Sequence, residues 1–400
     1  MTSRLLVILM LSLSARAETL DALVKEALDH NPEVAAAEKS WQAARARVPQ
    51  ARALDDPMVG VDVERMDTTR FDTFTDNEWM ISQNVPWFGK RGLKGNVESG
   101  MARKAEQAFR SRQFEVAAML KQAYYDLWQA QRERHLNQQT QMLMQQFVEV
   151  ATAKYEAGKS SQVDLLKAKT ELSKLQEAEI DVSRSVEKAR AEMKLQIGRD
   201  VDVEGAVPMP VMAFDLETAQ KLAAERRPEL LAVRHGEMPS AKASLDLAKR
   251  EYLPDFQFRV EARQYNGRSG IQEYDTGVFM NFPWLNPGKR NAAIREARLG
   301  VERTQFDYEA MKRRTEADVK KLFDGMETMH HHYNLFADKL IPQQRAAVEA
   351  ARASYETDKA SFLDLLDAQR MLLDFEMQNL HHAAEFYRLS AQLEQLTGGK

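Results

Sequence analysis

The sequence has 400 residues, with 56 Lys and Arg against 60 Asp and Glu, so its formal net charge is −4. This acidic balance argues against nucleic acid as a partner. The chain contains no cysteine, which excludes disulfides, thiol enzymes and a lipid-modified N-terminal cysteine. It also carries no Gly-rich phosphate loop and no clustered nucleophile and base. The sequence therefore predicts neither an enzyme nor a bound cofactor.

Residues 1–17 have the features of a signal peptide. Arg4 precedes an apolar run over 5–13, and a small-x-small cleavage pattern ends at Ala17. We expect the mature chain to begin at Glu18. No apolar stretch of about 18 residues follows, so any crossing of a bilayer would have to be made by strands.

Two pairs of strands are predicted. Val59, Val61 and Val63 alternate with polar residues and are followed by a second strand over 78–85, and the pattern returns at 256–263 and 274–282. Tilted strands of this length can cross a bilayer, but a barrel needs about eight and open edges cannot sit in lipid. The alternatives are a barrel shared between several chains and a small soluble sheet that caps the helices.

A long helix is predicted after each pair of strands. The stretches 93–155 and 291–355 contain no proline except Pro342, and each would reach on the order of 90 to 100 Å. We expect Pro342 to kink its helix. From residues 165 and 365 onward, apolar residues recur at steps of three and four, which gives each following helix one apolar stripe. Long helices alone would also suit an extended coiled-coil scaffold.

The second half of the chain repeats the first. ATAKYEAGKSSQVDLLKAKTEL at 151–172 returns as ARASYETDKASFLDLLDAQRML at 351–372, and NVPWFGKR at 84–91 returns as NFPWLNPGKR at 281–290. A period of about 200 residues is too long for a stacking repeat and indicates one duplicated unit. Each copy would run helix, hairpin, long helix, helix. The predicted segments are a first repeat over 18–204, a linker over 205–215 and a second repeat over 216–400.

The doubled string carries a resemblance to a known family. Tyr155, Gly158 and Asp164 return in part as Tyr355 and Asp364, and the whole mature chain resembles the TolC-like outer-membrane efflux channels. The Pro-Trp-x-Gly-Lys-Arg segment that begins at residue 86 looks most like the heavy-metal branch, the cobalt, zinc and cadmium resistance type. The resemblance implies a mixed α and β fold in two tandem repeats. Long coiled-coil helices would form a periplasmic barrel, and three protomers would share one transmembrane β-barrel, with four strands from each.

The resemblance places two tryptophans at the boundary between barrel and tunnel. Trp87 and Trp284 would lie at the membrane interface, which suits an aromatic ring with a polar edge. The basic pairs that follow them, Lys90-Arg91 and Lys289-Arg290, would meet lipid headgroups or stay in water. Ordinary packing tryptophans beside solvated basic pairs are the alternative.

The repeated string is expected at the periplasmic end, where each long helix turns back. Gly158 suits a helix stop, and Ser160 or Ser161 with Asp164 suits the start of the next helix. Capping alone would explain these residues. We also expect a periplasmic adaptor to dock at the turns, on Gly158, Lys159, Ser160, Ser161, Asp358, Lys359, Ala360 and Ser361.

Asp364 and Asp367 are predicted to line a channel entrance. A spacing of three puts both carboxylates on one helix face, and threefold symmetry would gather them in a ring that attracts cations. They match the aspartates that line the entrance in the resembled family, and Tyr355 and Asp164 match groups that latch it. The family's basic latch residue is absent, because its position is Ala360 here.

Histidines cluster at 330–332 and 381–382. His330 and His382 would lie at similar heights on antiparallel helices, so a transient metal contact is one interpretation. Histidines with no ligand role are the other.

The sequence and its resemblance predict the outer-membrane channel of a tripartite efflux system in a Gram-negative bacterium, exporting heavy-metal cations. Its partners would be two further copies of itself, a periplasmic adaptor and an RND-type inner-membrane pump that supplies the energy. The alternatives are a duct for organic compounds or type I secreted polypeptides, and a periplasmic scaffold or adaptor.

Overall fold

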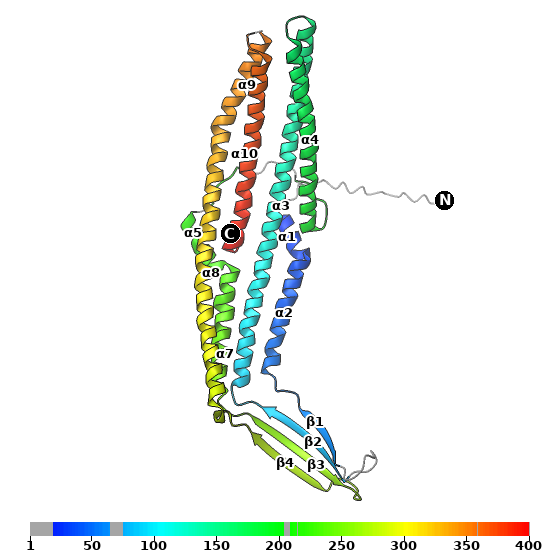
Figure 1. The fold of residues 1–400 in the computed structure, drawn as a ribbon, viewed down its shortest axis with the longest axis vertical. Helices are drawn as coiled ribbons and strands as arrows, with labels where there is room; N and C mark the ends of the chain where they lie inside the picture. Colours follow the sequence, from blue (N-terminus) through cyan, green and yellow to red (C-terminus); the bar gives the residue numbers. More distant parts are fainter. Residues whose placement is uncertain (1–18, 65–74, 204–208, 214, 358, 400) are drawn as a thin grey trace, which may run out of the picture. The chain divides into compact units, whose positions relative to one another are not determined.

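The computed structural model describes residues 19–64, 75–203, 209–213, 215–357 and 359–399. The predicted signal peptide and part of the predicted linker lie outside these residues. The described chain is mostly helical with one four-stranded antiparallel sheet (Figure 1). The elements are α1 (Leu20–His30), α2 (Pro32–Arg52), β1 (Met58–Glu64), β2 (Asp76–Val85), α3 (Lys90–Glu156), α4 (Gln162–Ile197), α5 (Leu216–Arg226), α6 (Pro228–Leu231), η1 (Ala232–Glu237), α7 (Met238–Arg250), β3 (Phe256–Tyr265), β4 (Glu273–Met280), η2 (Pro283–Leu285), α8 (Pro287–Leu335), η3 (Phe336–Leu340), α9 (Ile341–Glu356) and α10 (Phe362–Thr397).

The chain divides into two compact units. The hairpin unit contains the described residues of 1–34, 113–220 and 318–400, and so includes the two turns that carry the repeated string. The sheet unit contains 35–112 and 221–317, and so includes all four strands. No helix in the described part of the chain is long and apolar enough to cross a membrane.

The hairpin unit is built around the apolar stripes predicted for the two repeats. The stripe of α4 is buried at most of its predicted positions, among them Leu165, Ala168 and Leu175. Both hairpins, α3–α4 and α9–α10, contribute to one core, because buried residues of each pack together. That core comprises Met144, Phe147, Ala168, Leu175, Tyr355, Phe362, Leu365 and Leu366.

Next to Pro342, where a kink was predicted, the helix changes type. A π-helical turn, η3, ends at Leu340, and α9 begins one residue before Pro342. Proline has no N–H, so in a regular α-helix the carbonyl four residues before it would have no hydrogen-bond donor. A π-helical turn lets that carbonyl bond the N–H five residues on instead. The long second-repeat helix is therefore divided into α8, η3 and α9.

The sheet has the simple order β1-β2-β3-β4, and all neighbours are antiparallel. The four predicted strands are confirmed. The fourth ends at Met280 rather than at residue 282, because Pro283 starts the short 3-10 turn η2.

Four helices of the sheet unit follow the order of the strands to which they connect. α2 leads into β1, α3 follows β2, α7 leads towards β3 and α8 follows β4. Trp41 of α2 stacks on Phe109 of α3, with ring centroids 5.8 Å apart. Ser240 of α7 donates to the Val97 carbonyl of α3 over 3.0 Å. α8 joins the row beside the C-terminal end of α7 through the Tyr252 hydroxyl, which donates to Asn291 over 2.8 Å.

Candidate functional site

The turns of the two helical hairpins are built by helix capping, as one interpretation of the sequence predicted. Gly158 has φ +68°, the left-handed region that favours glycine. The Ser161 hydroxyl accepts from the Asp164 N–H over 3.2 Å at the start of α4. Ser361 does the same for Asp364 of α10, and the Asp364 carboxylate accepts the Ser361 N–H over 3.0 Å. These contacts satisfy N–H groups that the helix leaves without partners. Asp358 lies outside the described residues.

The two aspartates predicted to line the entrance have different surroundings. The Asp364 carboxylate is occupied by the capping box at the start of α10. Asp367, one turn further, keeps an exposed side chain, with Oδ1 3.5 Å from Nη1 of Arg370. The role of both in an entrance stays a prediction, and Asp367 is the carboxylate that the cap does not use.

Arg370 also joins the two hairpins. Its Nε donates to Oε1 of Glu171 on α4 over 2.8 Å, and its Nη2 bonds the other carboxylate oxygen. The hydrogen bonds from Arg370 outweigh burial and hold the pKa of the Glu171 carboxyl below its ordinary value. Sequence reasoning missed this pair. The opposite charges of residues 171 and 370 can be read in the sequence. Position 171 of the first repeat matches position 371 of the second, however, so comparing the repeats does not bring the two charges together.

Tyr355, a predicted latch residue, lies in the shared core. Lys154 of α3 donates to the Tyr355 carbonyl over 2.5 Å, and its ammonium lies 4.1 Å from the centroid of the Tyr355 ring. The Tyr355 ring also meets Phe362 edge-on, at 5.6 Å. Lys154 thus provides a cation beside Tyr355, although the position expected for a basic latch residue is Ala360.

The two copies of the repeated string differ in exposure. Tyr355 is 7% exposed but its counterpart Tyr155 is 42% exposed, and Leu366 is 1% exposed but Leu166 is 54% exposed. Val163, beside the first turn, is also exposed. The first hairpin therefore presents apolar side chains next to Gly158–Ser161, the predicted adaptor site.

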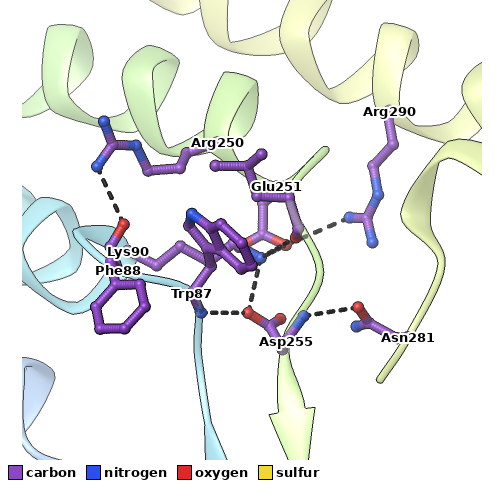
Figure 2. Close-up of polar contacts among 9 residues, drawn as sticks. Trp87, Phe88, Lys90, Arg250, Glu251, Asp255, Asn281 and Arg290 are labelled. Carbon is purple, nitrogen blue, oxygen red and sulfur yellow. Dashed lines mark hydrogen bonds and ion pairs between the residues drawn. The ribbon is translucent and has the colours of Figure 1, made fainter. Parts of the chain in front are cut away.

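In the sheet unit, a buried ion cluster lies where the strands meet the helices (Figure 2). Lys90, the first residue of α3, is 1% exposed, and its ammonium lies 2.9 Å from Asp255 and 3.6 Å from Glu251. It also donates to the Leu253 carbonyl over 2.8 Å. The expectation that Lys90 meets headgroups or water is wrong, because the segment between α7 and β3 surrounds its side chain with acceptors.

Asp255 connects this cluster to the strands. Its Oδ1 accepts the Trp87 N–H over 2.8 Å, and its own N–H donates to Asn281 over the same distance. Burial raises the pKa of the Asp255 carboxyl, but the bonds from Lys90 and Trp87 outweigh burial and leave this pKa below its ordinary value. The cluster thereby ties the ends of β2, β3 and β4 to the start of α3 (Figure 2).

The two tryptophans predicted at a membrane interface are not equivalent. Trp87 is half-buried and stacks on Phe256, with centroids 5.5 Å apart. Trp284 is exposed and meets Phe282 edge-on, at 5.2 Å. Ordinary packing therefore accounts for much of the Trp87 contact, and the interface role of both residues stays a prediction.

The sheet has one apolar face and one polar face. The register aligns Val59, Ile81 and Val260 in one row across three strands, and Phe258 with Val278 in another, and all five are exposed. The other face carries ion pairs. Arg263 lies 3.0 Å from Glu78, and Arg259 lies 2.6 Å from Glu261. An exposed row of apolar side chains on one face suits contact with a partner or an apolar medium.

The histidine clusters meet, but through a different residue from the one predicted. His332, rather than His330, stacks on His382, with centroids 5.0 Å apart, whereas the His330 ring lies 6.2 Å from Phe386. Burial lowers the pKa of His382, and His332 and His381 lower it further. Within the described residues, no group of three or more His, Cys, Asp or Glu is arranged to hold a metal ion.

Comparison with known families identifies the architecture. Residues 23–199 and 220–399 match the family model described as outer membrane efflux protein. The chain belongs to the outer membrane efflux protein family. It is accordingly an outer-membrane efflux channel with a periplasmic helical extension, and a transport protein rather than an enzyme, as the sequence predicted.

Individual relatives of this efflux channel have different substrates in their names. The cobalt-zinc-cadmium resistance protein CzcC of Cupriavidus metallidurans is 22% identical over 395 residues, covering 95% of this chain and 90% of CzcC. The alkaline protease secretion protein AprF of Pseudomonas aeruginosa is also 22% identical, over 76% of this chain and 67% of AprF. Among solved structures, the channel CusC superposes with a TM-score of 0.81 at 17% identity, covering 95% of this chain and 92% of that one. The predicted resemblance is thus confirmed, with a heavy-metal resistance protein among the relatives.

Proposed function

We propose that three copies of this chain form one outer-membrane channel, with four strands from each in a shared β-barrel and the helices in a periplasmic tunnel. The observation that carries this proposal is the sheet. Its apolar face is exposed, and its edge strands β1 and β4 offer backbone groups to neighbouring copies. In lipid such edges must be paired, and pairing β4 of one copy with β1 of the next closes a ring. The two tandem repeats each supply one hairpin, and Trp284 lies at the lipid interface.

The entrance is held closed by contacts between the two hairpins of each chain. Arg370 bonds Glu171 across them, and Lys154 bonds Tyr355. These contacts support a closing role because both cross from the first hairpin to the second, and both engage charged groups near the turns. An opened state must separate them.

The partners are a periplasmic adaptor and an inner-membrane pump. Proteins of this family form trimeric channels that work with both. The adaptor docks at the turns and contacts the exposed side chains of Tyr155, Val163 and Leu166. Docking there shifts α3 and α4 and separates Glu171 from Arg370, which opens the entrance.

The cargo is a heavy-metal cation. Two observations support this choice: the match to CzcC over nearly the whole chain, and the exposed carboxylate of Asp367 near the start of α10. A ring of Asp367 carboxylates would attract cations. The histidine pair His332 and His382 would give a transient contact for such an ion further along the tunnel.

Deletion of the channel's gene in its own host tests the cargo. Sensitivity to cobalt, zinc or cadmium should rise, and the unaltered gene should restore resistance where an Asp367→Asn variant restores it only in part. Asp374→Asn, on the same helix and also exposed, is the matched control. Increased sensitivity to organic solvents alone, or loss of a secreted protease alone, would refute the metal assignment.

A further inference from the structure

Three exposed arginines of the sheet unit lie around the start of α3. Arg91 is the second residue of α3, and its Nη1 donates to the carbonyl of Arg52, at the end of α2, over 3.3 Å. Arg250, at the end of α7, donates from Nη1 to the Phe88 carbonyl over 3.1 Å (Figure 2). All three arginine side chains are exposed. We call Arg52, Arg91 and Arg250 the arginine cluster.

Two glycines let these side chains approach α3 closely. A methyl group at Gly89 would collide with Nη1 of Arg250, and one at Gly95 would collide with Nε of Arg52. Gly89 also has φ +84°, in the left-handed region that favours glycine. The side chains from the ends of α2 and α7 therefore lie against α3 and the turn before it.

The charges of the arginine cluster are not neutralised within the described part of the chain. Lys90, one residue before Arg91, pairs with Asp255 and Glu251. Arg290, near the start of α8, also pairs with Glu251. None of the three clustered arginines lies within ion-pairing distance of a carboxylate among the residues that the structure describes. The cluster therefore presents three positive charges that can bind an anion.

Apolar side chains beside the cluster are exposed as well. Phe88 is 81% exposed and Leu54 is 40% exposed. Trp87 stacks on Phe256, the first residue of β3. Side chains alternate along a strand, so Phe256 lies on the same apolar face of the sheet as Phe258. The arginine cluster thus lies at the end of the apolar face, where the strands give way to helices.

An anionic phospholipid fits both the charged and the apolar part of this surface. If the apolar face lies in hydrocarbon, its helical end meets the headgroups of the periplasmic leaflet, because the helical extension is periplasmic. Arginine binds phosphate through its planar fork of donors, and aromatic rings favour the interface. The ammonium of a zwitterionic headgroup would be repelled by a cluster that lacks a carboxylate. A dissolved phosphate compound would leave Phe88 in water, so the exposed ring favours a lipid.

We propose that the arginine cluster binds the headgroup of an anionic phospholipid, with Phe88 and Leu54 beside its acyl chains. This inference rests on the proposed transmembrane barrel and names the lipid that meets its periplasmic end. Of the first basic pair predicted to meet headgroups, only Arg91 belongs to this site, because Lys90 is buried in its own ion cluster.

Mass spectrometry of the intact assembly tests the site. The full chain is purified in detergent and mixed with phosphatidylglycerol or phosphatidylcholine that have the same acyl chains. The unaltered protein should retain more phosphatidylglycerol. The variant Arg52→Gln, Arg91→Gln, Arg250→Gln should show a preference reduced by at least about tenfold, because each basic residue near an anionic surface contributes a factor of roughly five.

A matched control removes three exposed basic residues of α2 and α7 that lie further from the start of α3. It is Lys39→Gln, Arg47→Gln, Lys242→Gln, and it should keep the preference. If both triple variants behave alike, net charge selects the lipid and the proposed site is wrong. Excess inorganic phosphate should leave the lipid bound. Displacement would show that the cluster recognises phosphate alone, which would overturn the assignment to lipid.

The outcomes separate this site from the proposed channel. If the unaltered chain enters vesicles and conducts ions but binds both lipids equally, the site is wrong and the channel stands. If it never enters vesicles, both fail. The spectra also give the mass of the assembly, so a cluster variant that does not assemble is recognised. Arg250→Gln alone then decides: its preference should fall about fivefold, and an unchanged preference would refute the site.

Discussion

Breaking the bond between Glu171 and Arg370 should open the channel. Arg370→Met removes the guanidinium and keeps much of the side chain's bulk. The Glu171 side chain is 10% exposed and that of Arg370 is 43% exposed, so the pair is intermediate between a surface ion pair and a buried one. Surface pairs contribute about 0.2–1 kcal/mol, and removing one partner of a buried pair costs about 3–5 kcal/mol. With solvent screening, we expect the pair to stabilise the closed channel by about 1–2 kcal/mol. Its loss should therefore raise the ratio of open to closed channels by a factor of roughly 5–30.

Single-channel recording in planar bilayers measures this ratio directly. At neutral pH, the Arg370→Met channel should be open for a much larger share of the time than the unaltered channel. Arg345→Met is the matched control, since Arg345 bonds Glu376 over 2.5 Å within the second hairpin. If both variants behave alike, the bond between hairpins does not hold the entrance closed.

Acid should mimic the substitution. Arg370 lowers the pKa of Glu171 below its ordinary value of 4.5. The bond's contribution is therefore fully present above the ordinary carboxyl pKa and is lost as pH falls through the lowered one. The unaltered channel should open in that acidic range. Arg370→Met should lack this step, and a step that persists in the variant would assign the acid response to other carboxylates.

Three further predictions concern other parts of the chain. Lys90→Met should lower the free energy of unfolding in detergent by about 2 kcal/mol, because it leaves the partly exposed carboxylate of Asp255 without its cation. The double variant Lys90→Met, Asp255→Asn should recover part of that loss. Ser361→Ala should cost about 1 kcal/mol at the start of α10, seen as faster amide exchange there, and unchanged exchange would remove the capping argument. Zinc binding, measured by calorimetry, should fall when His332 and His382 are both replaced by Ala; unchanged binding would end the metal interpretation.

Local sequence patterns predicted the elements of this fold well. Spacing of three and four placed α4 and α10, and the lack of proline placed most of α3. Alternation placed β1 and β3, and polar loops after them placed β2 and β4. All these patterns depend on neighbours within a few residues. The caps at Ser161 and Ser361 were predictable for the same reason. A disturbance of the helix at Pro342 was predictable from the missing N–H of proline, although its form, a π-helical turn over Phe336–Leu340, was not.

The contacts that matter for the site could not be predicted in this way. Lys90 and Asp255 are far apart in the sequence, and so are Glu171 and Arg370. Each charge taken alone fits a solvated surface equally well. A buried Lys90 is stable only because the segment before β3 brings acceptors to it, and that placement depends on how the hairpins pair. Contacts between distant segments depend on how the whole chain packs. The periodicity of residues along the sequence does not predict them.

The duplicated string shows how the same residues come to serve different purposes. Leu366 is buried in a core that the chain completes by itself, whereas Leu166, at the matching position, remains exposed. A tandem duplication begins with two equal hairpins, but in one chain each hairpin meets the other through a different face. Leu166 and Val163 are therefore left exposed in the first hairpin, whereas the second hairpin buries Leu366. The unequal exposure of equal residues therefore supports the proposed adaptor contact at the first turn, because the matching residue of the second hairpin is already covered by the chain's own core.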